Sequence, residues 1–220
     1  MKTLIISCKT LENELNRAMA ECDCAYEVKW VESGLHNVPK LLTEALQELL
    51  DASPGYERIL IAMGYCGNAL AGLKTNEATM IIPRVDDCIT FMLGSFARRT
   101  ELAGGHGVYF MTEGWLRGER TIWHEYLYTI DKYGEKTGED IFKMMLSNYT
   151  TLAMLDTGCF DLSSIEDEVK DIAKTLKLDY VVVPATVDYL KNLLTGPWGD
   201  DLFLTIPPHS EIISTQLTMP

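Results

Sequence analysis

The chain of 220 residues carries 32 acidic and 19 basic side chains, which gives a formal net charge of −13 at pH 7. Nucleic acids and anionic membranes are bound through clusters of Lys and Arg, so this charge argues against both as partners. The composition, 47% hydrophobic and 23% charged, is typical of a globular protein with a buried core. The longest uncharged segments are too short to cross a bilayer.

The N-terminal segment MKTLIISCKTLENEL has a cysteine after an apolar stretch, an order also found in lipoprotein signals. Its apolar stretch, residues 4–7, is shorter than a signal peptide requires, so we interpret it as the first strand. We therefore expect a cytoplasmic protein whose six cysteines are reduced thiols rather than structural disulfides.

Apolar segments of strand length alternate with segments of helical period along the chain. The strand-like segments are rich in Ile, Val and Tyr with little polar alternation, which favours strands covered on both faces. They are residues 3–7, 26–31, 59–63, 80–83, 108–111, 152–155, 180–183 and 202–206. Helices are predicted at 39–52, beginning with Pro39, at 162–176, capped by Ser163 or Ser164, and within 119–148.

This alternation predicts an α/β fold with mostly parallel sheets and flanking helices. A boundary near AGGHG, residues 103–107, leaves four predicted strands on each side. We expect two Rossmann-like lobes around a cleft, residues 1–103 and 104–220; a single compact unit with one eight-stranded sheet is the alternative. The C-terminal tail is expected to be extended and to cover a sheet edge or a neighbouring subunit of a homo-oligomer.

Four cysteines lie within a few residues of the carboxyl end of a predicted strand: Cys8, Cys66, Cys88 and Cys159. Loops at the carboxyl edge of a parallel sheet converge in space, and ligands bind there. The sequence therefore predicts that three or four thiols share a metal site, holding zinc or an iron–sulfur cluster. Core packing is the alternative, because free cysteine is often buried and the chain contains no CxxC pair.

Other residues of these loops are candidate substrate contacts. Gly67 and Asn68 follow Cys66 in a turn that suits positive φ, with a phosphate-cradling role as the alternative. Trp115 follows the fifth predicted strand, where it either stacks on a flat ligand or packs in the core.

Charged residues follow the fourth predicted strand in the motif PRVDDC. Arg84 either pairs with the neighbouring Asp86 and Asp87 or binds a carboxylate or phosphate of a ligand. Asp87 is both a candidate substrate contact and, with Asp86, a candidate cap for a helix that begins at Cys88.

Several motifs occur along the chain in the order LIISC, GLHNVPKLLTEALQELLD, GYCGNALAGL, IIPRVDDCITFMLGS, FMTEGWL, KYGEKTGEDIF and LDTG. Over most of residues 1–160 this order resembles the family called domain of unknown function 1638. The resemblance matches the family's recurrent cysteines to Cys8, Cys66 and Cys88. It leaves the fourth ligand open between Cys159, His106, a carboxylate and an exogenous ligand.

The family occurs mainly in anaerobic archaea and bacteria, and its members are often encoded near corrinoid-dependent methyltransferases. The resemblance therefore implies a context in corrinoid and methyl metabolism, with a small molecule or a corrinoid methyltransferase system as the partner. It implies no particular reaction.

Three functions compete at this point. In the first, Cys8, Cys66 and Cys88 bind zinc or an iron–sulfur cluster with an open coordination position for one-carbon chemistry. In the second, Cys66 is the nucleophile of an enzyme that acts on a small anionic substrate held by Arg84. In the third, the protein is a non-catalytic module that binds a partner or a small ligand.

Overall fold

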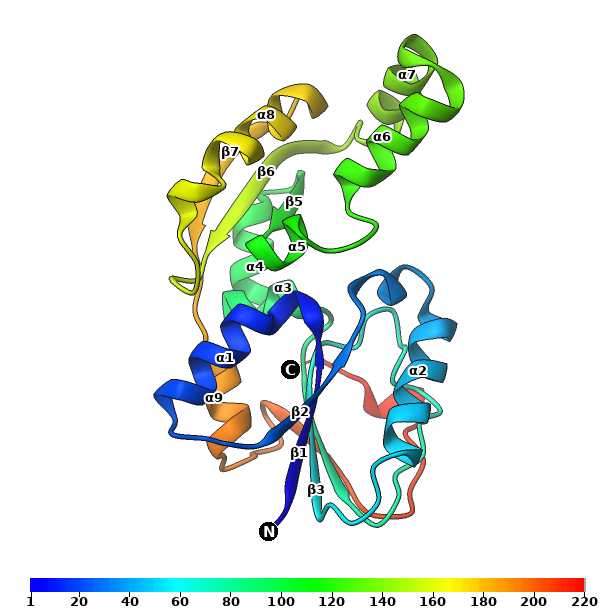
Figure 1. The fold of residues 1–220 in the computed structure, drawn as a ribbon, viewed down its shortest axis with the longest axis vertical. Helices are drawn as coiled ribbons and strands as arrows, with labels where there is room; N and C mark the ends of the chain where they lie inside the picture. Colours follow the sequence, from blue (N-terminus) through cyan, green and yellow to red (C-terminus); the bar gives the residue numbers. More distant parts are fainter. Residues whose placement is uncertain (220) are drawn as a thin grey trace.

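The computed structural model describes residues 1–219 and contains two sheets, each flanked by helices (Figure 1). The first sheet has the order β2-β1-β3-β4-β8, in which β1 to β4 run parallel and β8 runs antiparallel. In its register Leu4 lies between Glu27 and Ile59. The strands are β1 Thr3–Cys8, β2 Glu27–Val31, β3 Arg58–Ala62, β4 Thr79–Pro83 and β8 Phe203–Ile206.

The second sheet is parallel throughout, in the order β5-β6-β7. Its strands are β5 Gly107–Met111, β6 Tyr149–Asp156 and β7 Asp179–Pro184. Each predicted strand segment coincides with a strand of the described residues, and the predicted α/β class is confirmed. The interior strands are continuous apolar runs because both of their faces are covered; β1 is buried at every residue.

The boundary near residue 104 separates the two sheets, but the C-terminal segment returns to the first sheet. Ile206 of β8 pairs with Met80 of β4, and helix α9 (Asp188–Thr195) packs against α1 and α3. The described residues therefore form sheets of five and three strands, instead of four and four. We call residues 1–103 with 188–219 the first lobe, and residues 104–187 the second lobe.

The C-terminal tail lies along the first lobe of the same chain. Gly72 N donates to Ile212 O at 2.8 Å, and Thr75 N donates to Ser210 O at 2.9 Å. These backbone bonds place residues 210–212 of the tail beside residues 72–75, and residues 214–216 form a 3-10 turn.

The remaining helices connect and cover the sheets. They are α1 Glu12–Glu21, α2 Pro39–Asp51, α3 Cys88–Leu93, α4 Phe96–Ala103, α5 Glu113–Leu116, α6 Ile122–Tyr133, α7 Glu135–Met145 and α8 Glu166–Leu176, with short 3-10 turns η1 Lys9–Leu11, η2 Ser33–Asn37, η3 Leu162–Ser164 and η4 Ser214–Gln216. The predicted helix within 119–148 is two helices, α6 and α7, which break at Gly134 with φ +80 and form the hairpin that extends from the second lobe in Figure 1. Within residues 1–219, no helix has the length and apolarity needed to span a bilayer.

Of the predicted starts of α2 and α8, the first is confirmed and the second is wrong. Pro39 opens α2, as expected. Residues 162–164 form a 3-10 turn that Asp161 caps, and α8 starts only at Glu166, so neither Ser163 nor Ser164 caps that helix. The serines lie inside that turn, where the Asp161 carboxylate accepts the Ser163 N–H at 3.0 Å, and no side chain caps α8.

One face of the second sheet contributes to the core of the first lobe. Phe110 on β5, with Ala153 and Leu155 on β6, belongs to the apolar cluster of the first lobe. Their neighbours along the same strands, Met111 and Met154, belong to a second cluster that packs under α8. This alternation follows the two-residue period of a strand and fixes the second sheet against the first lobe.

Candidate functional site

A cavity of about 340 Å³ lies between the lobes, at the carboxyl edge of the first sheet. The loops after β1, β2, β3 and β4 form one side of it. Strand β5 and the segment that follows α5 form the other side. Its size and its position at the carboxyl ends of parallel strands suit a small-molecule ligand. We call it the interlobe cavity.

Three of the predicted cysteines line this cavity, and each comes from a different loop. Cys8 ends β1, Cys66 follows β3 and Cys88 begins α3 after β4. The Cys88 thiol neighbours both of the others, since the pKa of Cys8 depends on Cys88 and the pKa of Cys88 depends on Cys8 and Cys66. Cys8 and Cys88 are buried, whereas Cys66 is half-buried. We call these three side chains the thiol row; Cys66 is its accessible end.

The backbone holds the row together by joining the turns after β3 and β4. Tyr65 N donates to Val85 O at 2.9 Å, and Cys66 N donates to Asp86 O at 2.8 Å. Gly64 makes this contact possible, because a Cβ at that position would lie 2.4 Å from the Asp87 Cα. Glycine is therefore required here for close approach.

The turn that presents Cys66 has left-handed backbone conformations at three successive residues. The φ angles are +44 at Cys66, +69 at Gly67 and +66 at Asn68. Gly67 and Asn68 tolerate this region, as predicted, but a cysteine occupies it at a conformational cost. Backbone strain of this kind is concentrated at functional sites, where the surrounding structure holds one side chain in a required direction.

Neighbouring thiols and burial set the protonation of the buried members of the row. The contact with Cys66, together with burial, raises the pKa of Cys88 well above its usual value. The contact with Cys88, together with burial, raises the pKa of Cys8 in the same way, and Thr10 Oγ1 lies 3.1 Å from the Cys8 sulfur. Both buried thiols keep their protons at neutral pH, and Cys66 is the most exposed of the three thiols that line the cavity.

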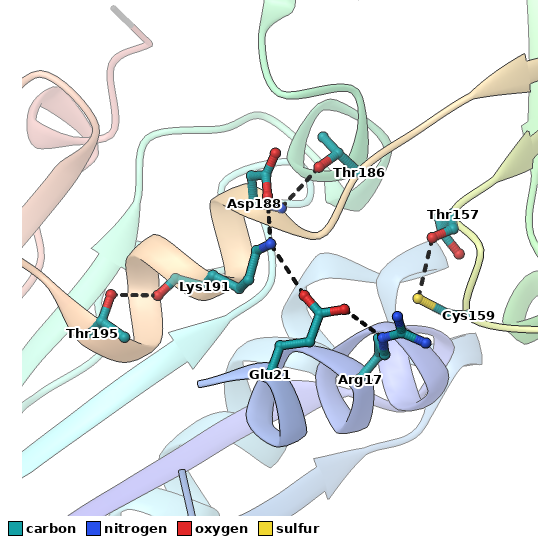
Figure 2. A network of polar contacts seen from close by, with 8 residues as sticks. All are labelled: Arg17, Glu21, Thr157, Cys159, Thr186, Asp188, Lys191 and Thr195. Carbon is teal, nitrogen blue, oxygen red and sulfur yellow. Dashed lines mark hydrogen bonds and ion pairs between the residues drawn. The ribbon is translucent and has the colours of Figure 1, made fainter. Parts of the chain in front are cut away.

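Cys159, the fourth predicted cysteine, lies outside the interlobe cavity. It follows β6 of the second sheet, and Figure 2 shows it beside Thr157, whose carbonyl accepts its S–H at 3.4 Å. Arg17 of α1 lies beside it in the same view and pairs with Glu21 on its other side. Because β6 belongs to the other sheet, its carboxyl edge leads to α1 rather than to the cavity. His106, the other ligand considered, is exposed and does not line the cavity.

The thiol row has the soft donors that zinc and iron–sulfur clusters use, but its arrangement is not that of a ready-made metal site. In the described part of the chain, no three side chains of His, Cys, Asp or Glu form a group that could hold a metal ion. Instead, the neighbouring Cys66 and burial raise the pKa of Cys88, so the middle thiol of the row keeps its proton. No chemical step is therefore assigned to a metal here.

The acidic residues after β4 are paired with a residue that the sequence analysis did not consider. Arg99 Nη1 lies 2.6 Å from Asp86 Oδ2 and 2.7 Å from Asp87 Oδ2. Asp87 also caps α3, as predicted, by accepting from Thr90 N at 2.9 Å. Burial raises the pKa of Asp87 and outweighs the effect of Arg99. These charges are engaged with one another at the cavity wall.

Arg84 does not line the interlobe cavity. Its Nε donates to Asp200 O at 2.8 Å and its Nη1 donates to Gln216 O at 3.3 Å, so the guanidinium holds the C-terminal segment. The ion pairs predicted for Arg84 are made by Arg99 instead, because β8 and the tail lie beside β4 and offer Arg84 their carbonyl groups.

Arg120 is a cation of the cavity that the sequence analysis missed. Its exposed side chain lies at the cavity lining, packed over Gly34, and its backbone has φ +55. The segment is fixed to the first lobe, because Asn37 Nδ2 donates to Arg120 O at 3.4 Å and Glu119 N donates to Ser33 Oγ at 3.1 Å. Within residues 1–219, Arg120 has no ion pair to a carboxylate.

Residues 30–194, about three-quarters of the chain, match the model of a family described as "Protein of unknown function (DUF1638)". The chain belongs to this family. The match includes Cys66, Cys88 and Arg120 but begins after Cys8, whereas the resemblance was placed over residues 1–160. Comparisons with curated proteins and with solved structures give no match.

The cavity of this DUF1638 protein combines an apolar wall with a polar rim. Trp115, half-buried, lines the wall beside Val108 and Phe110 of β5. On the opposite side, burial lowers the pKa of His36 after β2, so its imidazole is neutral at pH 7. The arrangement can bind a small molecule with an apolar part against Trp115 and an anionic part near Arg120, within reach of a thiol.

Proposed function

We propose that this DUF1638 protein binds a small anionic molecule with an apolar portion in the interlobe cavity and acts on it through the Cys66 sulfur. The observation that carries the proposal is that one cavity is lined by both Cys66 and Arg120, the first at the open end of the thiol row and the second without an ion pair in the described residues.

The chemistry is that of a cysteine nucleophile. The Cys66 thiolate forms a bond to an electrophilic carbon of the bound molecule, and the leaving group departs with the electron pair of the broken bond. Cys88 supports the attacking sulfur by hydrogen bonding to it. Arg120 holds the anionic end, and the apolar wall around Trp115 excludes water from the rest of the molecule.

Alkylation by two reagents of different charge tests this proposal without knowledge of the substrate. Iodoacetate and iodoacetamide deliver the same carbon with the same leaving group, but only iodoacetate is an anion. We expect Arg120→Ala to lower the ratio of the two rates at Cys66 about fivefold, since an exposed ionic contact contributes up to about 1 kcal/mol. The rates are read by mass spectrometry of the Cys66 peptide.

Arg117→Ala is the matched control, because Arg117 lies three residues earlier and pairs with Glu168 at 2.8 Å instead of lining the cavity. The ratio is expected to stay unchanged in this variant. An unchanged ratio in Arg120→Ala, or an equal decrease in both variants, would contradict the proposal.

The predicted metal-binding function is a second candidate, favoured by the placement of three thiols on one cavity. It requires Cys8 and Cys88 to lose their protons and the row to rearrange around an ion. Metal and acid-labile sulfide analysis of protein purified without oxygen tests it. Zinc or iron in stoichiometric amount, lost in Cys66→Ser and kept in Cys159→Ser, would support it; metal-free protein with freely alkylated thiols would contradict it.

The place of the protein in corrinoid and methyl metabolism, with a corrinoid methyltransferase system as its partner, stays a prediction from the family resemblance. The thiol row is compatible with it, because a cysteine thiolate is a suitable acceptor for an activated carbon group.

A further inference from the structure

Two thiols of different accessibility are neighbours at one end of the row. Cys66 faces the interlobe cavity and is half-buried, whereas Cys88 is 3% exposed. The two belong to separate loops, and the backbone bond from Cys66 N to Asp86 O holds those loops together. Cys88 follows Asp86 by two residues, so this bond keeps Cys66 and Cys88 as neighbours on one cavity wall, the placement that a disulfide between them requires.

We propose that Cys66 and Cys88 are a reversible redox pair, in which Cys66 takes up the oxidant and Cys88 closes a disulfide with it. The oxidant class is a hydroperoxide small enough to enter the cavity, and the reductant that reverses the reaction is a dithiol. This pair goes beyond the proposed function, since it needs neither an anionic ligand nor Arg120.

Two balanced steps form the disulfide. The Cys66 thiolate attacks the outer oxygen of the hydroperoxide, so that an S–O bond forms, the O–O bond breaks and the alcohol or water leaves after taking a proton; this gives the sulfenic acid. The Cys88 thiol then attacks the Cys66 sulfur, so that the S–S bond forms and the hydroxyl leaves as water with the Cys88 proton. A dithiol returns two electrons and two protons and restores both thiols.

The burial of each thiol assigns its role. Cys66 is the more exposed member of the pair and meets an oxidant in the cavity first, whereas Cys88 needs no access to solvent, because it attacks the sulfur of a neighbouring side chain. The Cys8 sulfur lies 3.1 Å from Thr10 Oγ1, and its pKa depends on Cys88, so Cys88 is the neighbour of both other thiols. Closing the disulfide removes the Cys66 nucleophile from the cavity, which would stop thiol chemistry there until a dithiol reopens it.

The experiment is peptide mapping without reduction, after reduced protein has been treated with one equivalent of hydrogen peroxide and its free thiols blocked. In the wild-type chain we expect a Cys66–Cys88 linked peptide that dithiothreitol removes. The link should persist in Cys8→Ser and in Cys159→Ser. In Cys88→Ser we expect no link, and dimedone should label Cys66 as the sulfenic acid.

The wild-type map decides the proposal even if Cys88→Ser fails to fold. Treated protein with Cys66 and Cys88 both unlinked, or with Cys66 linked to another cysteine, would overturn it, as would loss of the link in Cys8→Ser. Arg120→Ala separates the two proposals, since it should lower the preference for iodoacetate and leave the yield of the Cys66–Cys88 link unchanged.

Discussion

The two sheets of this protein end in similar loops but use them differently. After β3 the chain runs Gly64-Tyr65-Cys66 and lines the interlobe cavity, whereas after β6 it runs Thr157-Gly158-Cys159 and meets α1. At the second edge Thr157 Oγ1 donates to Glu14 of α1 at 2.9 Å, and Glu14 is fully buried. The carboxyl edge of a parallel sheet therefore becomes a candidate site only where no helix of the other lobe covers it.

The largest expected difference between the two edges concerns a glycine in each loop. At Gly64 a Cβ would lie 2.4 Å from the Asp87 Cα, whereas at Gly158 it would meet nothing within 4 Å. We expect Gly64→Ala to lower the free energy of unfolding by more than about 3 kcal/mol, because two backbone segments must separate. Gly158→Ala should cost only about 1 kcal/mol, owing to its φ of +67.

Urea denaturation of the two variants measures both values. Similar losses of unfolding free energy in the two variants would show that the backbone at Gly64 does not lie against the backbone at Asp87.

A difference in stability of intermediate size is expected between variants of two capping aspartates, one after β4 and one after β6. Asp87 caps α3 and pairs with Arg99, whereas Asp161 caps an exposed 3-10 turn after β6. Asp87→Ala is expected to cost about 2 kcal/mol of unfolding free energy, since both a cap and a half-buried ion pair are lost. Asp161→Ala should cost about 0.5 kcal/mol. Thermal unfolding of both variants checks the order, and a reversed order would contradict the description of these loops.

The smallest expected effect depends on pH and concerns Glu14, which lies at the carboxyl edge of the second sheet. Burial raises the pKa of Glu14 in the folded protein, with a contribution from Glu113, so the folded state binds the proton more tightly than the unfolded state. Stability from this group is complete below the unfolded pKa of about 4.5 and is lost as pH rises through the folded value. Glu14→Gln should therefore stabilise the protein by about 1 kcal/mol at pH 8 and change little at pH 4.

Urea unfolding of Glu14→Gln and of the wild-type chain at the two pH values measures this difference. A Gln variant that is less stable than the wild type at pH 8 would mean that the carboxylate is charged and stabilised where it lies.

Local patterns predicted the strands and the meeting of Cys8, Cys66 and Cys88, because periodicity marks buried strands and parallel strands share an edge. They did not reveal which strands belong to which sheet. The antiparallel return of β8 to β4 and the second edge at Cys159 depend on contacts between distant segments.

Arg120 was missed for a related reason: it lies in a segment that follows no predicted strand. It reaches the cavity only because Ser33 and Asn37 of the first lobe anchor that segment. Asp86 and Asp87 are close to Arg84 in sequence, but in the structure the Arg84 guanidinium donates to backbone carbonyl groups of the C-terminal segment. Pairings of this kind are decided by the packing of the lobes, which no local spacing encodes.

Cys66 and Cys88 are neighbours in the thiol row, whereas Cys159 lies apart from them, after a strand of the other sheet. The most direct test is the iodoacetamide labelling rate of each cysteine, read by mass spectrometry in the wild type and in Cys88→Ala. We expect Cys8 and Cys88 to react about 100-fold more slowly than Cys66, since labelling of a buried thiol requires local opening. Cys88→Ala should change the rate at Cys66 and leave Cys159 unaffected. Equal rates at Cys66 and Cys88, or equal changes at Cys66 and Cys159, would contradict the account.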